Sequence, residues 1–396
     1  MASSLKWLDY DATAYDRSTR MLALLKEPET RDELGIGRIR DALSDQLFPG
    51  TSVIQTRLRY MLLLPRMFID LENSRVAAKD FASRARVEEL TLNKRLKLQD
   101  GAFGKDSGDA LKRLASSVYW AGLRSWGILL RTGSQRDYYA AIDQIRDDRR
   151  QKLRYEDGLE DLDSPAPTWH ADIPTLLAST ALDEGSFALT RKEATFIREQ
   201  WKLHHPTTLL TWLAQDEARL IECKDAGLPW FHPQLPHAPA PLQALVAHAR
   251  RFSDLAHGAA LLYNLALAEA SGNTERNAEY GAALKRWSNN LPTLKLDTWD
   301  MPAFWEQVQQ GGKPVHTPLR RFVNEWLTLV NAGKADSDRA RELIKYREAD
   351  MKGNLSRFRP ENLPRWNGAS GVGRLNYRWS ITQSHLADLL RGLEAA

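Results

Sequence analysis

Two carboxylates and a lysine that could serve nuclease chemistry lie within one short segment. Asp216 precedes Glu222, Cys223 and Lys224. The carboxylates could bind a magnesium ion, and the lysine could stabilise the charge that develops on a phosphate. A restriction-type site needs its Glu-x-Lys pair on a strand, whereas the sequence from Asp216 to Ala226 is typical of a helix. A metal-dependent nuclease is therefore the least favoured of three functional hypotheses, and no catalytic residue is assigned.

Histidines lie on either side of the single cysteine, Cys223. His204 and His205 precede it, and His232 and His237 follow it. Zinc would need three or four of these ligands to converge within about 2.0–2.3 Å. Histidines beside prolines more often form hydrogen bonds in loops, so no metal site and no cofactor is expected. One cysteine also excludes an intramolecular disulfide framework, as is usual in a reducing cytoplasm.

Positive and aromatic residues alternate near the C-terminus. Six Lys or Arg residues and one acid, Glu361, lie between Met351 and Ser380. Cations that follow phosphates and rings that stack on bases are the ingredients of a groove for single-stranded nucleic acid. The predicted phosphate contacts are Arg357, Arg359, Arg374 and Arg378, and the predicted stacking residues are Trp366, Tyr377 and Trp379. The alternative is that these rings are buried against the N-terminal helices, for instance around Trp7, and that the arginines cap helix ends or meet the acidic linker described below.

Two helices joined by a turn are expected in residues 31–65. The first extends from about Asp32 to Leu47, and the turn follows at Phe48-Pro49-Gly50-Thr51-Ser52, where proline presets φ and glycine relaxes it. The second extends from Val53 to about Leu64 and stops at Pro65. This arrangement is compatible with a helix-turn-helix, although the turn is longer than usual.

The second of these helices is basic, with no acid from residue 53 to residue 66. A recognition helix presents donors to base edges and phosphates in its first turns. The residues predicted to bind nucleic acid here are Gln55, Arg57, Arg59 and Arg66. In the alternative interpretation, Arg57 and Arg59 pair with Asp41 and Asp45 on the preceding helix.

The rest of the chain predicts a mostly α, multi-helical fold, because apolar residues recur at helical spacing and Val- and Ile-rich runs bounded by tight turns are almost absent. The clearest helical stripe lies between Pro241 and Ala270, and Gly258 is a position at which it could divide into two helices. The segments 30–33 and 190–193 both match the capping box.

An acidic segment with two prolines, residues 156–170, predicts a linker between domains. It separates an N-terminal helical domain, residues 1–155, from a central helical domain, residues 171–335. Residues 336–396 would form a last helix and an irregular, basic and aromatic tail. Two helical subdomains with an irregular basic C-terminal segment are therefore expected.

Several motifs carry a resemblance to a known family. They are WLDY at 7–10, RDELGIGRIRD at 31–41, LFPGTS at 47–52, IQTR at 54–57, RY at 59–60 and GRLNYRW at 373–379. This pattern resembles a bacterial family catalogued as domain of unknown function 6361. The resemblance implies a subunit of an anti-phage defence system, because members of the family are encoded near helicases and other defence genes. At Pro65-Arg66 the sequence departs from the family, in which a bulky residue follows the proline, and a shared role for position 66 is in doubt.

The overall composition is that of a globular protein with a weak positive charge. The 396 residues carry a net charge of +4, and 43% are hydrophobic. No apolar run is long enough for a membrane span or a signal peptide, so a cytoplasmic location is expected. The leading hypothesis is a nucleic-acid-associated, non-catalytic subunit of a defence system, binding DNA or RNA. The alternative is a helical protein-interaction scaffold for a helicase or nuclease partner.

Overall fold

The computed structural model describes residues 32–74, 76–103, 113–155, 167–178, 182, 184–312 and 314–395. Across these residues the structure is helical, without a β-strand, and contains an isolated antiparallel bridge between Leu129 and Trp169. The predicted mostly α, multi-helical fold is confirmed. Within the same ranges, no helix has both the length and the apolar character that a membrane crossing requires.

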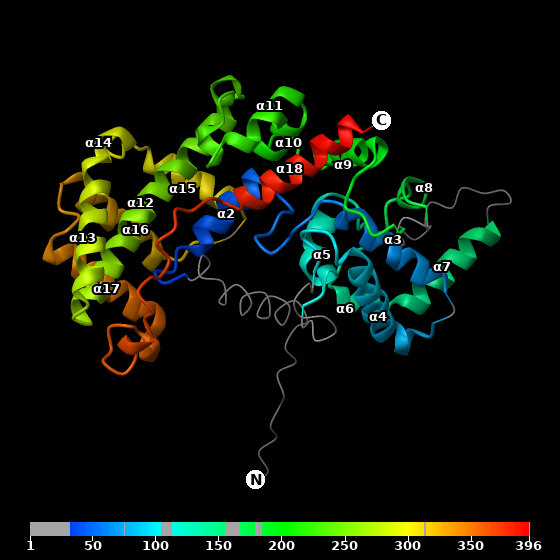
Figure 1. Ribbon diagram of the computed structural model, residues 1–396, viewed down its shortest axis with the longest axis horizontal. Helices are drawn as coiled ribbons and strands as arrows, with labels where there is room; N and C mark the ends of the chain where they lie inside the picture. The colour runs from blue at the N-terminus through cyan, green and yellow to red at the C-terminus, as the bar shows by residue number, and fades with distance from the viewer. Residues whose placement is uncertain are drawn as a thin grey trace, which may run out of the picture. The chain divides into compact units, whose positions relative to one another are not determined.

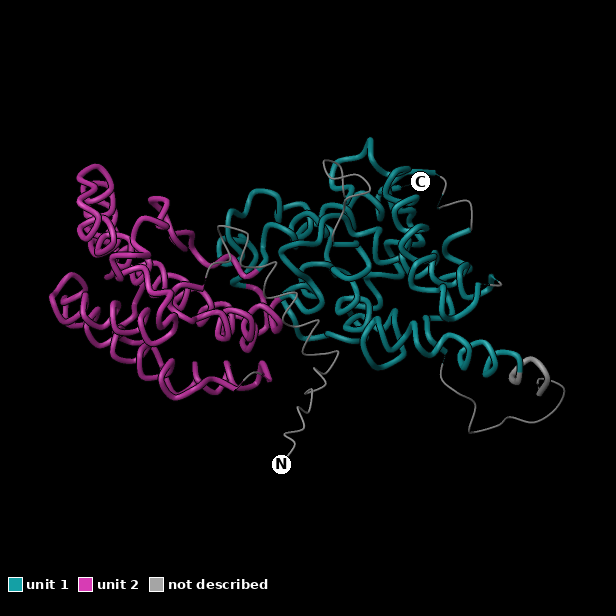
Figure 2. Tube along the Cα trace, turned by 90° about the horizontal axis from the view of Figure 1, so that it is seen from below, with its two compact units in different colours: residues 1–13, 48–236, 378–396 teal, residues 14–47, 237–377 magenta. Residues whose placement is uncertain are grey.

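The described residues form two compact units, each made of stretches that are far apart in the sequence (Figure 2). The first unit contains residues 48–236 and 378–395, and the second contains residues 32–47 and 237–377. These limits differ from the predicted domain boundaries: the central segment divides at 236 and the C-terminal segment at 377. The amino-acid composition shows where helices are interrupted, but the limits of the two units depend on which helices pack together. Residues 156–166 of the predicted linker lie outside the described residues.

The first unit is built around α3 and the C-terminal helix α18 (Figure 1). α3 packs against α4, α5 and α8, and α18 packs against α9, α10 and α11. Its helices are α3 (Tyr60–Asn73), α4 (Ala78–Leu96), α5 (Ala115–Ser125), α6 (Gln135–Ala140), α7 (Ile142–Tyr155), α8 (Ile173–Leu176), α9 (Arg191–His204), α10 (Leu209–Ala214), α11 (Glu217–Glu222), η4 (Cys223–Asp225), η5 (Pro229–Phe231) and α18 (Trp379–Glu394). The short turn η6 (Leu235–His237) leads into the second unit.

Aromatic rings fill part of the core of the first unit. Phe68 of α3 stacks on Trp169 with ring centroids 5.6 Å apart, and Trp120 and Tyr138 meet Phe68 edge-on. The buried carboxylate of Glu72 accepts hydrogen bonds from Tyr138 Oη at 2.7 Å and Trp169 Nε1 at 2.8 Å. Rings with satisfied polar atoms stabilise a core both by burial and by their edge-to-face geometry.

The second unit is built around the long helix α12, which packs against α13, α17 and α2. Its helices are α2 (Gly37–Leu47), α12 (Ala240–Ala270), α13 (Thr274–Asn289), α14 (Leu291–Leu294), α15 (Met301–Gln310), α16 (Thr317–Asn331), α17 (Asp338–Lys352), η7 (Gly353–Leu355) and η8 (Leu363–Arg365). α2 also packs against α15.

The two segments that match the capping box differ in the structure. Thr190 and Glu193 form the capping box at the start of α9, as predicted. In the other segment Thr30 lies outside the described residues, and α2 begins at Gly37 rather than at Asp32. The Asp32 carboxylate instead accepts hydrogen bonds from the backbone N–H groups of Ile36 at 2.6 Å and Gly37 at 2.8 Å. Asp32 therefore satisfies first-turn donors from outside the helix.

Gly258 does not divide α12, which is continuous through it. The Trp287 ring of α13 lies against the Gly258 backbone, where an added Cβ would clash with it. Trp287 is fixed there because its Nε1 donates to the Asp254 carbonyl at 3.0 Å and its ring stacks on Trp326. The glycine allows this close approach of α12 and α13.

We expect Gly258→Ala to lower the free energy of unfolding by about 1–3 kcal/mol, because the added methyl group must displace the Trp287 ring. Gly281→Ala in α13 is the matched control, since an added Cβ there meets no atom within 4 Å. It should raise stability by about 0.5–1 kcal/mol, the usual gain in helix propensity. Urea denaturation measures both, and equal effects at the two positions would contradict this role for Gly258.

Candidate functional site

The segment predicted as a recognition helix has another conformation. Residues 53–59 form turns, and α3 begins at Tyr60 and continues through Pro65 to Asn73. The prediction of a helix from Val53 that stops at Pro65 is therefore wrong. α3 is buried on nearly every side, and the packing of this apolar stretch outweighs the hydrogen bond that the proline lacks.

Gln55 stabilises the turn that precedes α3. Its side chain is buried, its Oε1 accepts from the Ser52 backbone N–H at 3.1 Å, and its Nε2 donates to the Gly50 carbonyl at 3.0 Å. Gly50 has φ of 76°, and Trp126 lies against it with its Nε1 donating to the Pro49 carbonyl at 2.8 Å. Both polar groups of the Gln55 amide are therefore used within the protein.

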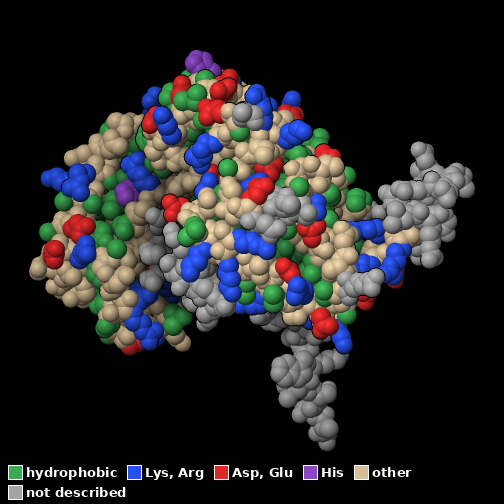
Figure 3. Space-filling view, turned by 45° about the vertical axis from the view of Figure 1, so that its right-hand side comes forward, with side chains coloured by type: hydrophobic (Ala, Val, Ile, Leu, Met, Phe, Trp, Pro, Cys, Tyr) green, Lys and Arg blue, Asp and Glu red, His purple; other side chains and the backbone are tan. Residues whose placement is uncertain are grey.

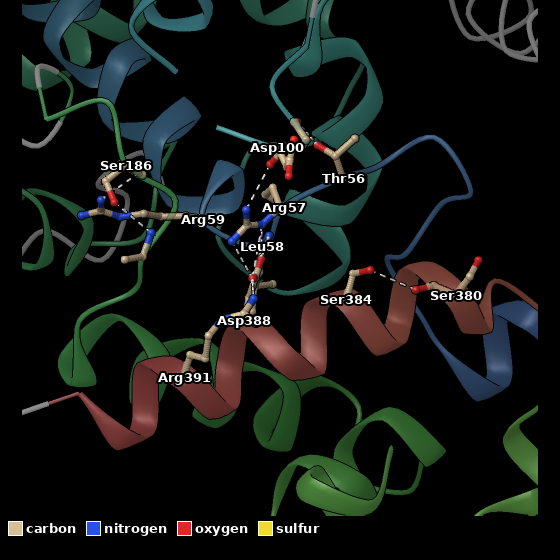
Figure 4. Close-up of polar contacts among 12 residues, drawn as sticks. Thr56, Arg57, Leu58, Arg59, Asp100, Ser186, Ser380, Ser384, Asp388 and Arg391 are labelled. Carbon is tan, nitrogen blue, oxygen red and sulfur yellow. Dashed lines mark hydrogen bonds and ion pairs between the residues drawn. The ribbon is translucent and has the colours of Figure 1, made fainter. Parts of the chain in front are cut away.

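Arg57 forms a bidentate ion pair with Asp388 of α18 (Figure 4). Its Nη2 and Nε donate to the two carboxylate oxygens at 2.8 and 3.0 Å, and its Nη1 donates to the Asp100 carbonyl at 3.1 Å. The same carboxylate accepts from the Leu58 backbone N–H at 3.0 Å and from Arg391. The Asp388 side chain is only 2% exposed, so these donors replace the water that it lacks.

Arg59 is buried and pairs with a carboxylate of α9. Its Nη2 donates to Glu193 Oε1 at 2.9 Å, and its Nη1 donates to the Ser186 carbonyl at 3.0 Å and approaches Glu184 at 3.5 Å. Glu193 is the residue whose other carboxylate oxygen closes the capping box of α9. The Arg57 and Arg59 partners are thus Asp388 and Glu193, and the predicted pairing with Asp41 and Asp45 is wrong.

Arg66 connects α3 to α8. Its Nη2 pairs with Asp70 at 2.7 Å, and its Nη1 donates to the carbonyls of Pro174 and Leu177 at 3.3 and 3.0 Å. Three partners hold the guanidinium against the protein's own backbone. As it lies, Arg66 is not presented to a phosphate.

The three rings of the C-terminal segment are buried. Trp366 Nε1 donates to Asn264 at 3.1 Å, and Tyr377 Oη donates to the Ala249 carbonyl at 2.6 Å, both on α12. Trp379 Nε1 donates to the Ala226 carbonyl at 2.6 Å in the first unit. The rings are therefore not presented for stacking on bases. The alternative is confirmed in part: the rings are buried, but Trp366 and Tyr377 lie against α12 rather than against the N-terminal helices. Trp7, suggested as their neighbour, lies outside the described residues.

The four arginines of this segment differ in their contacts. Arg378 donates to the Thr51 carbonyl at 2.9 Å, and Arg374 pairs with Asp254 at 3.2 Å. Arg359 lies 3.7 Å from Glu361, and both are exposed. Arg357 is partly buried, and its backbone N–H donates to the buried carboxylate of Glu348 at 2.7 Å.

The predicted binding residues do not share one unit. Gln55, Arg57, Arg59, Arg66, Arg378 and Trp379 belong to the first, and Arg357, Arg359, Trp366, Arg374 and Tyr377 belong to the second. On the face drawn in Figure 3, Lys and Arg side chains occur at many places with Asp and Glu among them. The geometry that the nucleic-acid prediction required, exposed cations beside exposed rings, is not formed by these residues.

The residues of the nuclease hypothesis lie on short helices. Asp216 caps α11, its Oδ1 accepting from the Arg219 backbone N–H at 3.0 Å, while Glu222 ends α11 and Lys224 lies in η4. In the part of the chain that is described, no three His, Cys, Asp or Glu side chains are grouped so that they could hold a metal ion. His232 Nε2 lies 3.0 Å from the Arg219 carbonyl, and His205 Nε2 lies 2.9 Å from Ser125 Oγ.

One buried histidine belongs to none of the sequence motifs. His385 of α18 is fully buried, and neither ring nitrogen has a hydrogen-bond partner among the described residues. Burial lowers the pKa of His385 to about 4, because the neutral ring is favoured there; Asp388 opposes this shift and Arg57 adds to it. Its spacing from Leu386 and Leu389 on one helix face was the signal that could have indicated a core position.

Comparison with known families gives one result. The family described as a family of unknown function (DUF6361) matches residues 2–392. The chain belongs to this family. No curated protein and no solved structure matches it. In the structure, Leu47 of the LFPGTS motif ends α2, the rest of that motif and IQTR lie in the turns before α3, and GRLNYRW leads from the second unit into α18.

We expect Asp388→Asn to lower the free energy of unfolding by about 3–5 kcal/mol, because it leaves the Arg57 charge without its buried partner. Arg391→Gln is the control, since it removes an exposed donor to the same carboxylate and should cost less than about 1 kcal/mol. Urea denaturation followed by circular dichroism compares them. Similar losses in the two variants would show that the Arg57 pair is not the stabilising one.

His385 should make stability depend on pH. Its pKa is about 4 in the folded protein and 6.5 as the ordinary value, so the unfolded chain binds more protons between these limits. The stabilisation is complete above pH 6.5 and is lost as the pH falls toward 4, by about 1.4 kcal/mol per pH unit. We expect His385→Leu to lose this slope, and His237→Gln, at an exposed position, to keep it. Denaturation curves at pH 4.5, 5.5, 6.5 and 7.5 test this, and parallel pH profiles for wild type and His385→Leu would disprove it.

Proposed function

We propose that this protein is a non-catalytic, helical interaction subunit that binds a protein partner. A helicase or nuclease of a bacterial anti-phage defence system is the kind of partner that the family resemblance implies. The observation that carries the proposal is a surface groove with an apolar floor, between α16 and α17 of the second unit. It is supported by the internal use of the cations and rings that the sequence had suggested for nucleic acid.

The groove lies between α16 and α17 and has a volume of about 520 Å³. Buried Phe322 and Leu343 form its floor, and Tyr346 stands on its rim with 73% of its surface exposed. Arg321 also lines it, exposed and without a hydrogen bond or ion pair among the described residues. Tyrosine and arginine beside an apolar pocket are typical of the residues that dominate protein interfaces.

The groove carries charges of both signs. Arg339 pairs with Glu325 and lies near Glu342, so two acids line the same surface. Asp350 adds a third. Three arginines, Arg321, Arg339 and Arg347, line the same groove, so positive and negative charges are balanced there, and a protein segment can offer both charges and an apolar side chain. Met351 and Leu355, which follow along α17 and η7, are also exposed.

A second candidate is nucleic-acid association through the second unit, because Arg359 and Arg374 keep partly exposed guanidinium groups. Such a binder would shift DNA or RNA with an affinity that falls steeply with salt. If DNA or RNA still binds after the double change of Arg359→Gln and Arg374→Gln, this candidate is removed. If wild type binds either nucleic acid and the double change abolishes that binding, this candidate is favoured over the interaction subunit.

We expect the pair Tyr346→Ser and Arg321→Glu to reduce recovery of the bound partner by roughly 10-fold or more, because it removes the two exposed anchors of the groove. The control is Leu203→Ser on α9, which replaces another apolar residue that is 69% exposed. Affinity purification from the native host, with quantitative mass spectrometry, measures the partner recovered with each variant. Equal recovery with the groove variant and wild type would contradict the proposal for this surface.

A further inference from the structure

We propose that the first unit binds a small organic acid, an apolar body that carries one carboxylate or phosphate group, in a cavity beside α3 and α7. The cavity has a volume of about 350 Å³, and its walls come from α3, α7, α8, residue 131 and the segment 167–171. This volume lies in the range of small-molecule sites in proteins. The site is independent of the groove between α16 and α17, which belongs to the other unit.

One wall of the cavity is apolar and held in place. It includes Ile69, Ile145, Trp169 and Pro174. Trp169 is stacked on Phe68 and donates from Nε1 to the buried carboxylate of Glu72, so its ring cannot turn without losing both contacts. A wall that is already formed does not have to be ordered when a ligand binds, which lowers the cost of binding.

Arg131 provides the first reason to expect an anion. It is partly buried at the cavity and has no hydrogen bond or ion pair with any described residue. The backbone just before Arg131 is held by the antiparallel bridge between Leu129 and Trp169. In it, the Leu130 N–H donates to the Thr168 carbonyl and the His170 N–H donates to the Ile128 carbonyl, each at 2.9 Å. A guanidinium stays charged in proteins, and a partly buried one without a partner gains from an anionic ligand.

Arg149 of α7 provides a second cation at the same cavity. Its Nη1 donates to Asn73 at 2.6 Å and its Nη2 to Glu72, and these bonds orient the guanidinium and leave other N–H donors unused. Asp148 is the acidic residue of the lining and Glu72 already pairs with Arg149, so Arg131 is the cation of the lining that has no ion-pair partner among the described residues. The combination selects against a cationic ligand.

The apolar wall and the two cations together specify the ligand class. Inorganic phosphate would reach the arginines and leave the wall in contact with water, whereas an aryl or alkyl group attached to the acid would cover it. The proposal therefore predicts that phenyl phosphate or benzoate binds more tightly than inorganic phosphate, and that benzylamine, with the same ring and a positive charge, does not bind.

Isothermal titration calorimetry on the full chain tests this with those four probes. Arg131→Gln should weaken the binding of phenyl phosphate or benzoate by roughly 10-fold or more, as the loss of a charged hydrogen bond does. Arg136→Gln on α6 is the matched control, because Arg136 is exposed and does not line the cavity. It should leave the affinity within about 2-fold of wild type, the change expected of a distant surface charge.

A second variant tests the contribution of the cavity space to binding, apart from that of the Arg131 charge. Ala171 lines the cavity and is exposed, so Ala171→Phe fills the space without removing a core contact, and it should abolish binding while the melting temperature stays near that of wild type. Ala140→Phe, at an exposed position outside the cavity, is its control. The proposal is overturned if neither organic acid binds, if inorganic phosphate binds as tightly, or if both Arg131→Gln and Ala171→Phe bind like wild type.

Discussion

The buried pair between Arg57 and Asp388 is the interaction on which the first unit depends. It joins the turns before α3 to the C-terminal helix across 331 positions of sequence. Arg59 extends it to α9 through Glu193, so two arginines in one short segment fix two helices. Each carboxylate is almost inaccessible to water and also accepts a backbone N–H. Charges in such places are stabilising only while every partner is present.

The chain passes from the second unit into the first between Tyr377 and Arg378, and both residues are left-handed, with φ of 55° and 69°. Side chains other than glycine adopt this region at a cost of about 1–2 kcal/mol each. The hydrogen bonds of Tyr377 to Ala249 and of Arg378 to Thr51 hold the backbone there. Tyr377 and Arg378, which the sequence suggested for a ligand, are thus held in this conformation by contacts within their own units.

Much of the fold could be predicted from local patterns. Helical spacing gave the mostly α class, and the capping box at Thr190 located the start of α9, because both depend on residues within a few positions of each other. The partners of Arg57 and Arg59 could not be predicted in this way. A cation on one face of a segment has the same sequence pattern whether it meets a phosphate or a carboxylate that lies 134 or 331 positions away. Burial of Trp366, Tyr377 and Trp379 is likewise decided by α12 and α18, whose packing no local pattern specifies.

The division of the first unit into two stretches has a consequence for synthesis. Its larger stretch, residues 48–236, emerges from the ribosome before residues 237–377, and α18 follows only after both. Until α18 arrives, Arg57 has no Asp388, and the apolar face of α9 on which α18 packs is uncovered. The second unit, by contrast, can bring α12 to α17 together as soon as they are translated. The first unit therefore lacks its last helix while residues 237–377 are being synthesised, and its uncovered apolar face is open to chaperones during that interval.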